Sequence, residues 1–129
     1  MIDKAYIIDD DEVSLFLTSM LLEAGSYVQK VESFGNAVKA LHALEKEDPQ
    51  NMPEIIFLDL NMPDLSGWEF LDILTKEKHK YLDKCKIFIL SSSVDIAEKE
   101  KAKEYQLVTA FLHKPLEEEE LAKVFASFY

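Results

Sequence analysis

Five short apolar runs divide the sequence, and polar residues follow each of them. The runs cover residues 5–8, 27–31, 55–58, 87–90 and 109–112, and the second is more polar than the others. A short continuous apolar run bounded by turn residues is typical of a buried strand, and a more polar run is typical of a sheet edge. The pattern therefore predicts five strands, one of them at an edge.

After each run, apolar residues recur at steps of three and four positions, which predicts five helices. The residues that define the helices are Val13, Phe16, Leu17, Met20, Leu21 and Ala24; Ala37, Val38, Leu41 and Leu44; Trp68, Phe70, Leu71 and Leu74; a more polar stretch from Val94 to Tyr105; and Leu121, Val124, Phe125 and Phe128. Gly25 and Pro49 are expected to end the first two helices, and the third is expected to begin near Ser66. Residues 76–86 are predicted to form an exposed connection because acidic and basic side chains alternate there.

This alternation of strands and helices predicts an α/β fold. Strands that are apolar throughout indicate a parallel sheet with both faces covered. Right-handed crossovers then give a doubly wound (βα)5 fold, which is a three-layer sandwich. In this class ligands bind beyond the carboxyl ends of the strands, so the residues that follow the strands are the candidates for a functional site.

Composition and charge limit the class of protein. A length of 129 residues fits one domain spanning 1–129, and an apolar content of 48% argues against intrinsic disorder. With 25 acidic and 14 basic residues the net charge is −11, which disfavours binding to nucleic acids or to anionic membranes.

The single cysteine and the N-terminal acids bear on the compartment. Cys85 leaves no partner for an intramolecular disulfide, which fits a reducing compartment, and its apolar neighbours predict a buried thiol. Acidic residues near the N-terminus argue against a signal peptide, and apolar runs of at most four residues argue against a membrane-spanning helix. We therefore expect a soluble cytoplasmic domain.

Chemically active side chains stand at four of the five predicted strand ends. Asp9, Asp10 and Asp11 follow the first strand, Asp59 the third, Ser91 the fourth and Lys114 the fifth. Clustered carboxylates raise one another's pKa values and call for a cation, and hard oxygen ligands suit Mg²⁺. A metal, an ammonium and a hydroxyl around one carboxylate would hold a phosphoryl group there, so Asp59 is predicted to be a nucleophile that accepts phosphate.

Each of these signals has a simpler explanation when it is taken alone. The acids after the first strand also suit a loop or a helix start, and Asp59 and Ser91 also suit helix caps. Lys114 with Pro115 also suits an ordinary strand end. Their joint position at four strand ends favours a site. The histidines at 42, 79 and 113 have no metal-ligand spacing and are expected to be structural.

Four segments carry a resemblance to a known family. IIDDD at 7–11, LDLNMPDLSG at 58–67, ILSS at 89–92 and FLHKP at 111–115 resemble the receiver domain of two-component response regulators, and the likeness covers essentially the whole chain. The resemblance implies a flavodoxin-like fold with strand order 2-1-3-4-5. It also implies a switch that is phosphorylated on aspartate and depends on Mg²⁺.

The resemblance assigns roles around the metal and the phosphoryl group. It implies that Asp59 is the phosphoacceptor, that Asp10 binds Mg²⁺ directly and that Asp9 helps to hold the metal through water. The backbone carbonyl of Asn61 would be a further ligand. Asp11 is adjacent but is not expected to be a ligand.

The resemblance also assigns the residues that respond to phosphorylation. Ser91 takes the position of the switch hydroxyl, Lys114 that of the lysine that contacts phosphate, and Phe111 that of the aromatic rotamer switch. The Lys114–Pro115 peptide bond would be cis. Serine replaces the more frequent threonine at 91 and keeps the hydroxyl, whereas Phe111 lacks the hydroxyl of a tyrosine. A core phenylalanine is an open alternative to a moving switch at 111.

The leading functional prediction is a stand-alone response regulator receiver that is not an enzyme with an external substrate. A sensor histidine kinase or a histidine phosphotransfer protein would phosphorylate Asp59. The output would reach an unknown downstream protein, a phosphorelay histidine or a second copy of the chain as a phosphorylated homodimer, with no nucleic acid and no membrane as partner.

Three alternatives belong to other classes. A phosphatase of the haloacid dehalogenase type would need a second aspartate two residues after the nucleophile, where this chain has Asn61. A receiver-type binding module could work without phosphate, although the key groups are all present. A flavodoxin-like electron carrier would need a first loop that holds a flavin phosphate, and acids stand there instead.

The first helix carries a second apolar stripe beside its predicted core face. Leu15, Thr18 and Leu22 form this stripe. A helix that is apolar on two sides is either unusually buried or docks a partner. We therefore hypothesise that this stripe, with Leu116, contacts a helix of a histidine phosphotransfer protein, and extra core burial is the alternative.

Overall fold

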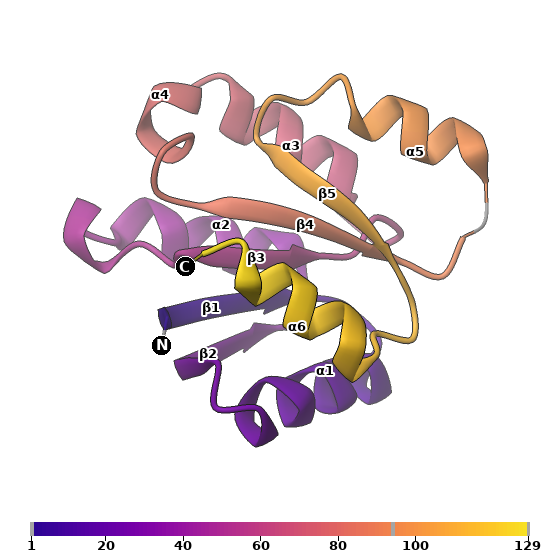
Figure 1. The fold of residues 1–129 in the computed structure, drawn as a ribbon. Helices are drawn as coiled ribbons and strands as arrows, with labels where there is room; N and C mark the ends of the chain where they lie inside the picture. The colour runs from indigo at the N-terminus through magenta and orange to yellow at the C-terminus, as the bar shows by residue number, and fades with distance from the viewer. Residues whose placement is uncertain (1, 94, 129) are drawn as a thin grey trace.

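Five parallel strands form the centre of the fold, which a computed structural model describes for residues 2–93 and 95–128 (Figure 1). The strands are β1 (Ile2–Ile8), β2 (Val28–Phe34), β3 (Ile55–Leu58), β4 (Lys86–Ser91) and β5 (Val108–His113). Their order in the sheet is β2-β1-β3-β4-β5. The predicted flavodoxin-like α/β class and its strand order are therefore confirmed, and the more polar strand β2 lies at an edge.

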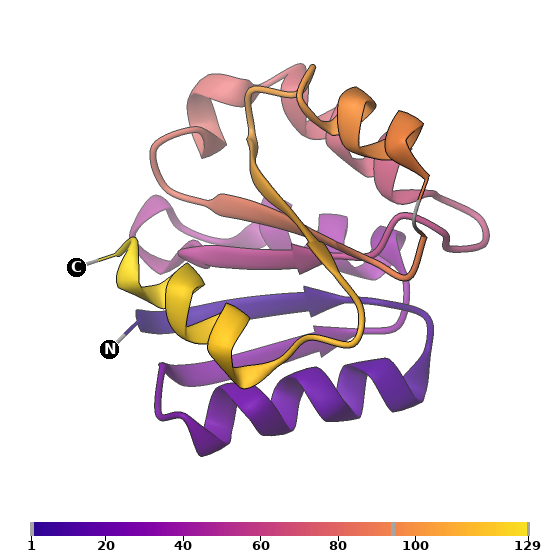
Figure 2. The ribbon, with the colours of Figure 1, turned by 45° about the vertical axis from the view of Figure 1, so that its right-hand side comes forward.

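Helices cover both faces of the sheet (Figure 2). They are α1 (Glu12–Ala24), α2 (Ala37–Lys46), the 3-10 helix η1 (Pro49–Asn51), α3 (Gly67–Thr75), α4 (Lys78–Tyr81), α5 (Ile96–Ala102) and α6 (Glu118–Ala126). Buried residues of α2, α3, α4 and α5 pack against one face of the sheet, and those of α1 and α6 pack against the other. The three-layer arrangement is therefore the predicted one.

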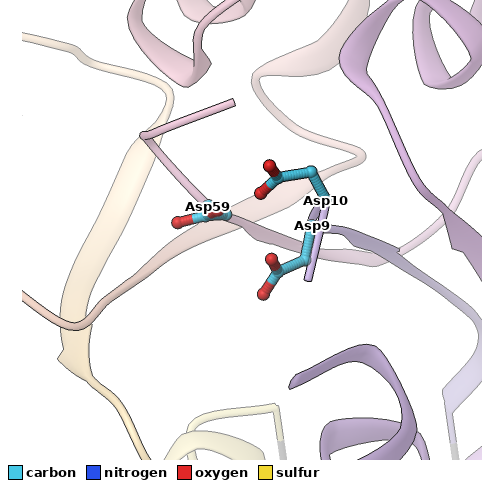
Figure 3. Close-up of side chains that lie close together, drawn as sticks. All are labelled: Asp9, Asp10 and Asp59. Carbon is cyan, nitrogen blue, oxygen red and sulfur yellow. The ribbon is translucent and has the colours of Figure 1, made fainter. Parts of the chain in front are cut away.

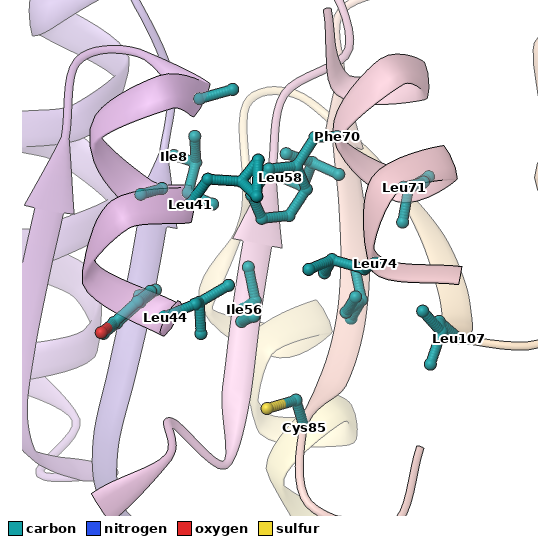
Figure 4. Close-up of a cluster of buried hydrophobic side chains, with 14 of the residues drawn as sticks. Ile8, Leu41, Leu44, Ile56, Leu58, Phe70, Leu71, Leu74, Cys85 and Leu107 are labelled. Atoms are coloured by element: carbon teal, nitrogen blue, oxygen red, sulfur yellow. The ribbon is translucent and has the colours of Figure 1, made fainter. Parts of the chain in front are cut away.

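The core on the α2–α3 face shows why the strands are apolar throughout. Leu41 and Leu44 of α2 and Phe70 and Leu74 of α3 meet the sheet around Ile56, and all of them are at most 7% exposed (Figure 4). Side chains alternate between the two faces of a strand, and both faces are covered here. A fully apolar strand is the consequence.

Strand register brings the candidate residues to one edge of the sheet. Ile8 of β1 pairs with Leu58 of β3, and Leu58 pairs with Ile89 of β4. Ser91 at the end of β4 pairs with His113 at the end of β5. The residues that follow these strands therefore lie at the same edge of the sheet, as expected for the carboxyl ends of parallel strands.

Polar side chains fix the helix starts near this edge. Asp11 caps α1 by accepting a hydrogen bond from the Val13 N–H, and Asp95 caps α5 in the same way. The third helix was expected to begin near Ser66, and Ser66 is indeed its N-cap; together with Glu69 it forms a reciprocal capping box at the start of α3. Side-chain caps of this kind satisfy N–H groups that have no partner within the helix.

Helix α1 is oriented differently from the prediction. Val13, Phe16, Leu17 and Met20, which were predicted to face the core, are at least 50% exposed. The second stripe is the buried one, because Thr18 and Leu22 are at most 4% exposed and Leu15 is half-buried. Leu116, which the hypothesis added to this stripe, is only 7% exposed. The hypothesis that Leu15, Thr18 and Leu22 dock a partner together with Leu116 is therefore wrong, and extra core burial, its alternative, is the correct description.

Smaller corrections concern helix boundaries. Residues 76–86 include the helix α4, and Tyr81 and Cys85 are buried there, so this connection is not wholly exposed. The polar helix α5 ends at Ala102 rather than at Tyr105, and its predicted start at Val94 lies outside the described residues. Val38 is 41% exposed, so it lies off the buried face of α2. Among the described residues, no helix has the length and apolar content that crossing a membrane requires.

Candidate functional site

Three carboxylates meet at the carboxyl edge of the sheet. Asp9 and Asp10 follow β1 and Asp59 follows β3, and each offers an oxygen that lies within 4.8 Å of the other two (Figure 3). Asp9 and Asp59 are buried, whereas Asp10 is exposed. Backbone hydrogen bonds fix two of these residues: the Asp9 N–H donates to the Phe34 carbonyl, and the Asp59 N–H donates to the Ile8 carbonyl.

Lys114 brings a positive charge to the cluster from the end of β5. Its Nζ lies 2.7 Å from Asp9 Oδ2 and 3.6 Å from Asp59 Oδ1. The Lys114 N–H donates to the Ser91 carbonyl at 2.8 Å, and the following Lys114–Pro115 peptide bond is cis. The ammonium therefore bridges the acids of β1 and β3 from a backbone anchored to β4.

The pKa of Asp59 is raised from 3.8 to about 7. Burial is the largest cause, and the neighbouring charge of Asp9 adds to it. The charge of Lys114 acts in the opposite direction and lowers the pKa, but it does not outweigh the first two effects. One ammonium therefore leaves the cluster short of positive charge, and a further cation would relieve the repulsion.

The residues present fit Mg²⁺. All of the side-chain donors are carboxylate oxygens, which this hard cation prefers, and few of them suffice because it retains several waters. The exposed position of Asp10 leaves the cluster open to water. Asn61, whose backbone carbonyl the family resemblance adds to the ligands, is exposed two residues beyond Asp59.

The two predicted switch residues lie on adjacent strands. Ser91 is 1% exposed at the end of β4; its Oγ accepts a hydrogen bond from the Ser93 N–H at 3.0 Å and donates to Glu98 Oε1 at 3.3 Å. Phe111 of β5 pairs with Ile89 and is half-buried against the core on the α2–α5 face. Half-burial leaves the aromatic ring partly exposed in this arrangement.

A groove of about 460 Å³ lies beside the cluster, between α1 and the segment that follows β5. Its lining residues are Asp11, Val13, Ser14, Leu17, Thr18, Leu21, Ser92, Lys114, Pro115 and Leu116. Lys114 lines the groove and also contacts Asp9 and Asp59 of the acidic cluster. A molecule that occupies the groove therefore contacts Lys114, whose Nζ lies 3.6 Å from Asp59 Oδ1.

Sequence reasoning missed Glu98 and left Asp11 without a positive role. Asp11 is the N-cap of α1 and lies outside the acidic cluster. Its position two residues before Val13 is the ordinary signal for such a cap. Glu98 contacts Ser91 across a loop, and its only sequence signal is an acidic residue in the first turn of α5, which helix dipoles favour anyway.

Comparisons with known proteins agree with this geometry. The family model of the response regulator receiver domain matches residues 5–126. Transcriptional regulatory protein BtsR of Salmonella typhi is 32% identical over 123 residues, which are 93% of this chain and 45% of that protein. This chain therefore spans less than half the length of that curated relative.

Solved structures give the same result. A two-component response regulator from Cytophaga hutchinsonii matches with a TM-score of 0.87 at 28% identity, over 98% of this chain and 96% of that one. Chemotaxis protein CheY4 of Vibrio cholerae shares the fold, with a TM-score of 0.80 at 23% identity over the full length of both chains. This chain belongs to the family of response regulator receiver domains.

Proposed function

We propose that residues 1–129 act as one receiver domain that accepts a phosphoryl group on Asp59 from a sensor histidine kinase or a histidine phosphotransfer protein. The proximity of Asp59 to Asp9, Asp10 and the Lys114 ammonium carries this proposal most directly. A carboxylate beside two other acids and one ammonium suits a nucleophile whose phosphorylated form needs positive charge around it.

In the proposed reaction, an Asp59 carboxylate oxygen attacks phosphorus while the phosphorus–nitrogen bond of the phosphohistidine breaks. The leaving imidazole nitrogen keeps the electron pair and takes a proton. Lys114, already within 3.6 Å of Asp59, stabilises negative charge on the phosphoryl oxygens. Mg²⁺ held by Asp9, Asp10, Asp59 and the Asn61 carbonyl would neutralise charge on the same oxygens.

The output is proposed to begin at Ser91 and Phe111. The Ser91 hydroxyl donates a hydrogen bond to the phosphoryl group, and the half-exposed Phe111 ring then turns inward. This changes the surface that a downstream protein, a phosphorelay histidine or a second copy of the chain contacts. The chain is proposed to catalyse only its own phosphorylation and dephosphorylation, in the cytoplasm, where its lone thiol at Cys85 remains reduced.

Intact mass measurement tests the phosphoryl acceptance. After incubation with acetyl phosphate and Mg²⁺, the wild type should gain one phosphoryl group. The control Asp83→Asn, which removes one exposed carboxylate that lies outside the cluster, should gain one as well. Asp59→Asn should gain none, and omission of Mg²⁺ should abolish the gain. Equal phosphorylation of Asp59→Asn and the wild type would refute the proposal.

The groove beside Lys114 is the proposed docking site for the histidine phosphodonor. A donor histidine must reach Asp59, so its protein has to cover the surface next to the cluster. That surface is the groove, and it extends onto the exposed apolar residues Phe16, Leu17 and Met20 of α1. Helices with complementary apolar side chains would bury this face.

A charged substitution separates docking from chemistry. Leu17→Asp should slow phosphotransfer from a histidine kinase that phosphorylates the wild type, whereas acetyl phosphate should modify both proteins equally. Val38→Asp is the matched control, because Val38 is a similarly exposed apolar residue on α2, which covers the other face of the sheet. The docking site would be contradicted if Leu17→Asp and Val38→Asp slowed phosphotransfer from the kinase equally. It would also be contradicted if Leu17→Asp slowed phosphorylation by the kinase and by acetyl phosphate to the same extent.

A further inference from the structure

The Ser91 hydroxyl is bound to helix α5. Its Oγ donates to Glu98 Oε1 at 3.3 Å and accepts from the Ser93 N–H at 3.0 Å. Both partners lie beyond the end of β4, in the loop and in the first turn of α5. The hydroxyl that the proposed function requires at the phosphoryl group is therefore already engaged with another anion.

The contact between Ser91 and Glu98 belongs to a larger chain of hydrogen bonds. Ser93 Oγ accepts from the Asp95 N–H at 3.1 Å, and Asp95 Oδ1 accepts from the Ala97 N–H at 2.9 Å. Together with the two bonds of Ser91, these connect the end of β4 to the start of α5. A displacement of the Ser91 hydroxyl thus breaks the first link of a connected series.

We propose that Glu98 is a positioning residue that holds the Ser91 hydroxyl on α5 and opposes its move to the phosphoryl group. The proposal rests on the proposed function, because it concerns the same hydroxyl. A carboxylate and a phosphoryl group are both anionic acceptors, and a hydroxyl has one proton to donate to either of them. Phosphorylation therefore exchanges one anionic acceptor for the other and releases the first turn of α5 from β4.

Burial strengthens the competition. Ser91 is 1% exposed, and Glu98 is half-buried although it belongs to a short polar helix. A hydrogen bond shielded from water is stronger than an exposed one, and an ionised acceptor strengthens it further. Loss of the Glu98 carboxylate should therefore free the hydroxyl and favour the phosphoryl-bound arrangement.

The test uses beryllofluoride, a phosphoryl mimic, as the probe, with its affinity measured by calorimetry in the presence of Mg²⁺. Glu98→Ala should bind it about fivefold more tightly than the wild type, which corresponds to loss of one modest hydrogen bond. Glu98→Gln retains a neutral acceptor and should lie between the two. Glu100→Ala removes the same charge from an exposed position on the same helix and should change the affinity less than twofold.

A double-mutant cycle distinguishes positioning from a general effect on α5. In a Ser91→Ala background the hydroxyl is absent, so Glu98→Ala should leave the beryllofluoride affinity unchanged. An equal effect of Glu98→Ala with and without Ser91, an equal effect of Glu100→Ala, or no effect at all would overturn the proposal. If the wild type fails to bind beryllofluoride, the proposed function itself fails, and the inference fails with it; binding without coupling overturns the inference alone.

Hydrogen exchange gives a second readout. In the wild type, beryllofluoride binding should speed amide exchange in the first turn of α5, because the link from Ser91 is released. In Glu98→Ala that turn should already exchange faster, and the probe should add little. A first turn equally protected in both proteins, with and without the probe, would contradict the release of α5.

Discussion

The charge of Asp59 should destabilise the folded domain when no divalent cation is present. Asp59 lies beside Asp9 and Asp10, and Lys114 compensates only in part. Replacement of Asp59 by asparagine removes one negative charge, keeps the size of the side chain and offers an amide donor to Asp9. We therefore expect Asp59→Asn to be more stable than the wild type in EDTA at pH 8.

The magnitude follows from the pKa of Asp59. Its rise from 3.8 to about 7, at about 1.4 kcal/mol for each pH unit, corresponds to at most about 4 kcal/mol. Water at the rim of the cluster screens the charge, which reduces the expected gain to about 2 kcal/mol. That is a large fraction of the stability of a domain of this size.

The pH dependence has a definite sign. The folded state binds the Asp59 proton more tightly than the unfolded chain does, so this group destabilises the fold progressively as the pH rises from about 4 to about 7. The effect levels off above pH 7, as Asp59 becomes fully ionised in the folded state as well. The advantage of Asp59→Asn should therefore be larger at pH 8 than at pH 5, by about 1 kcal/mol after the same screening.

Urea denaturation in EDTA at pH 5 and pH 8 measures both quantities. Asp83→Asn, which removes an exposed carboxylate away from the cluster, should change the unfolding free energy by less than about 0.5 kcal/mol at either pH. Addition of Mg²⁺ should stabilise the wild type more than Asp59→Asn. If the stability advantage of Asp59→Asn is equal at both pH values, the charge of Asp59 is not what destabilises the folded domain.

Three further predictions concern packing and access. Gly67→Ala should destabilise the fold by about 2 kcal/mol or more in thermal denaturation, because the new Cβ would approach the backbone carbonyl of Asp59 and lie 2.8 Å from Leu60 Cα; an unchanged melting temperature would contradict this. Leu22→Ala should cost about 3 kcal/mol and Phe16→Ala less than about 1 kcal/mol, since Leu22 is fully buried and Phe16 is 64% exposed; equal losses in urea denaturation would mean that α1 is oriented differently. Cys85 is buried and burial raises its pKa to about 12, so Ellman's reagent should react with it in guanidinium but not in the native protein at pH 8.

The parts of the fold that could be predicted are those that the strands determine. The run at 55–58 is apolar at every position because both faces of β3 are covered, and the chain becomes polar at Asp59, where the sheet ends. The same transition occurs after Ile8 and at Ser91. Parallel strands align these transitions at one edge, so strand pattern alone was enough to bring together the acids of the cluster.

The face of α1 could not be predicted in the same way. Val13, Leu17 and Met20 repeat at helical spacing, but Leu15 and Leu22 do so as well, and periodicity does not indicate which set meets the sheet. The longer stripe was predicted to face the sheet, but Val13, Leu17 and Met20 of this stripe are exposed. An exposed apolar face on a helix is itself informative, because its neighbour is the groove beside Lys114, where a phosphodonor is proposed to dock.

Glu98 illustrates a different limit. Asp59 and Lys114 are found from their positions at strand ends, but Glu98 reaches Ser91 across seven positions of sequence and a loop, and an acid in a first helical turn has an ordinary explanation. The groups that perform the proposed chemistry are thus anchored in the sheet, whereas the group proposed to restrain the response lies on a helix of seven residues. Changes on α5 can therefore alter how strongly phosphorylation is transmitted without altering the site that accepts the phosphoryl group.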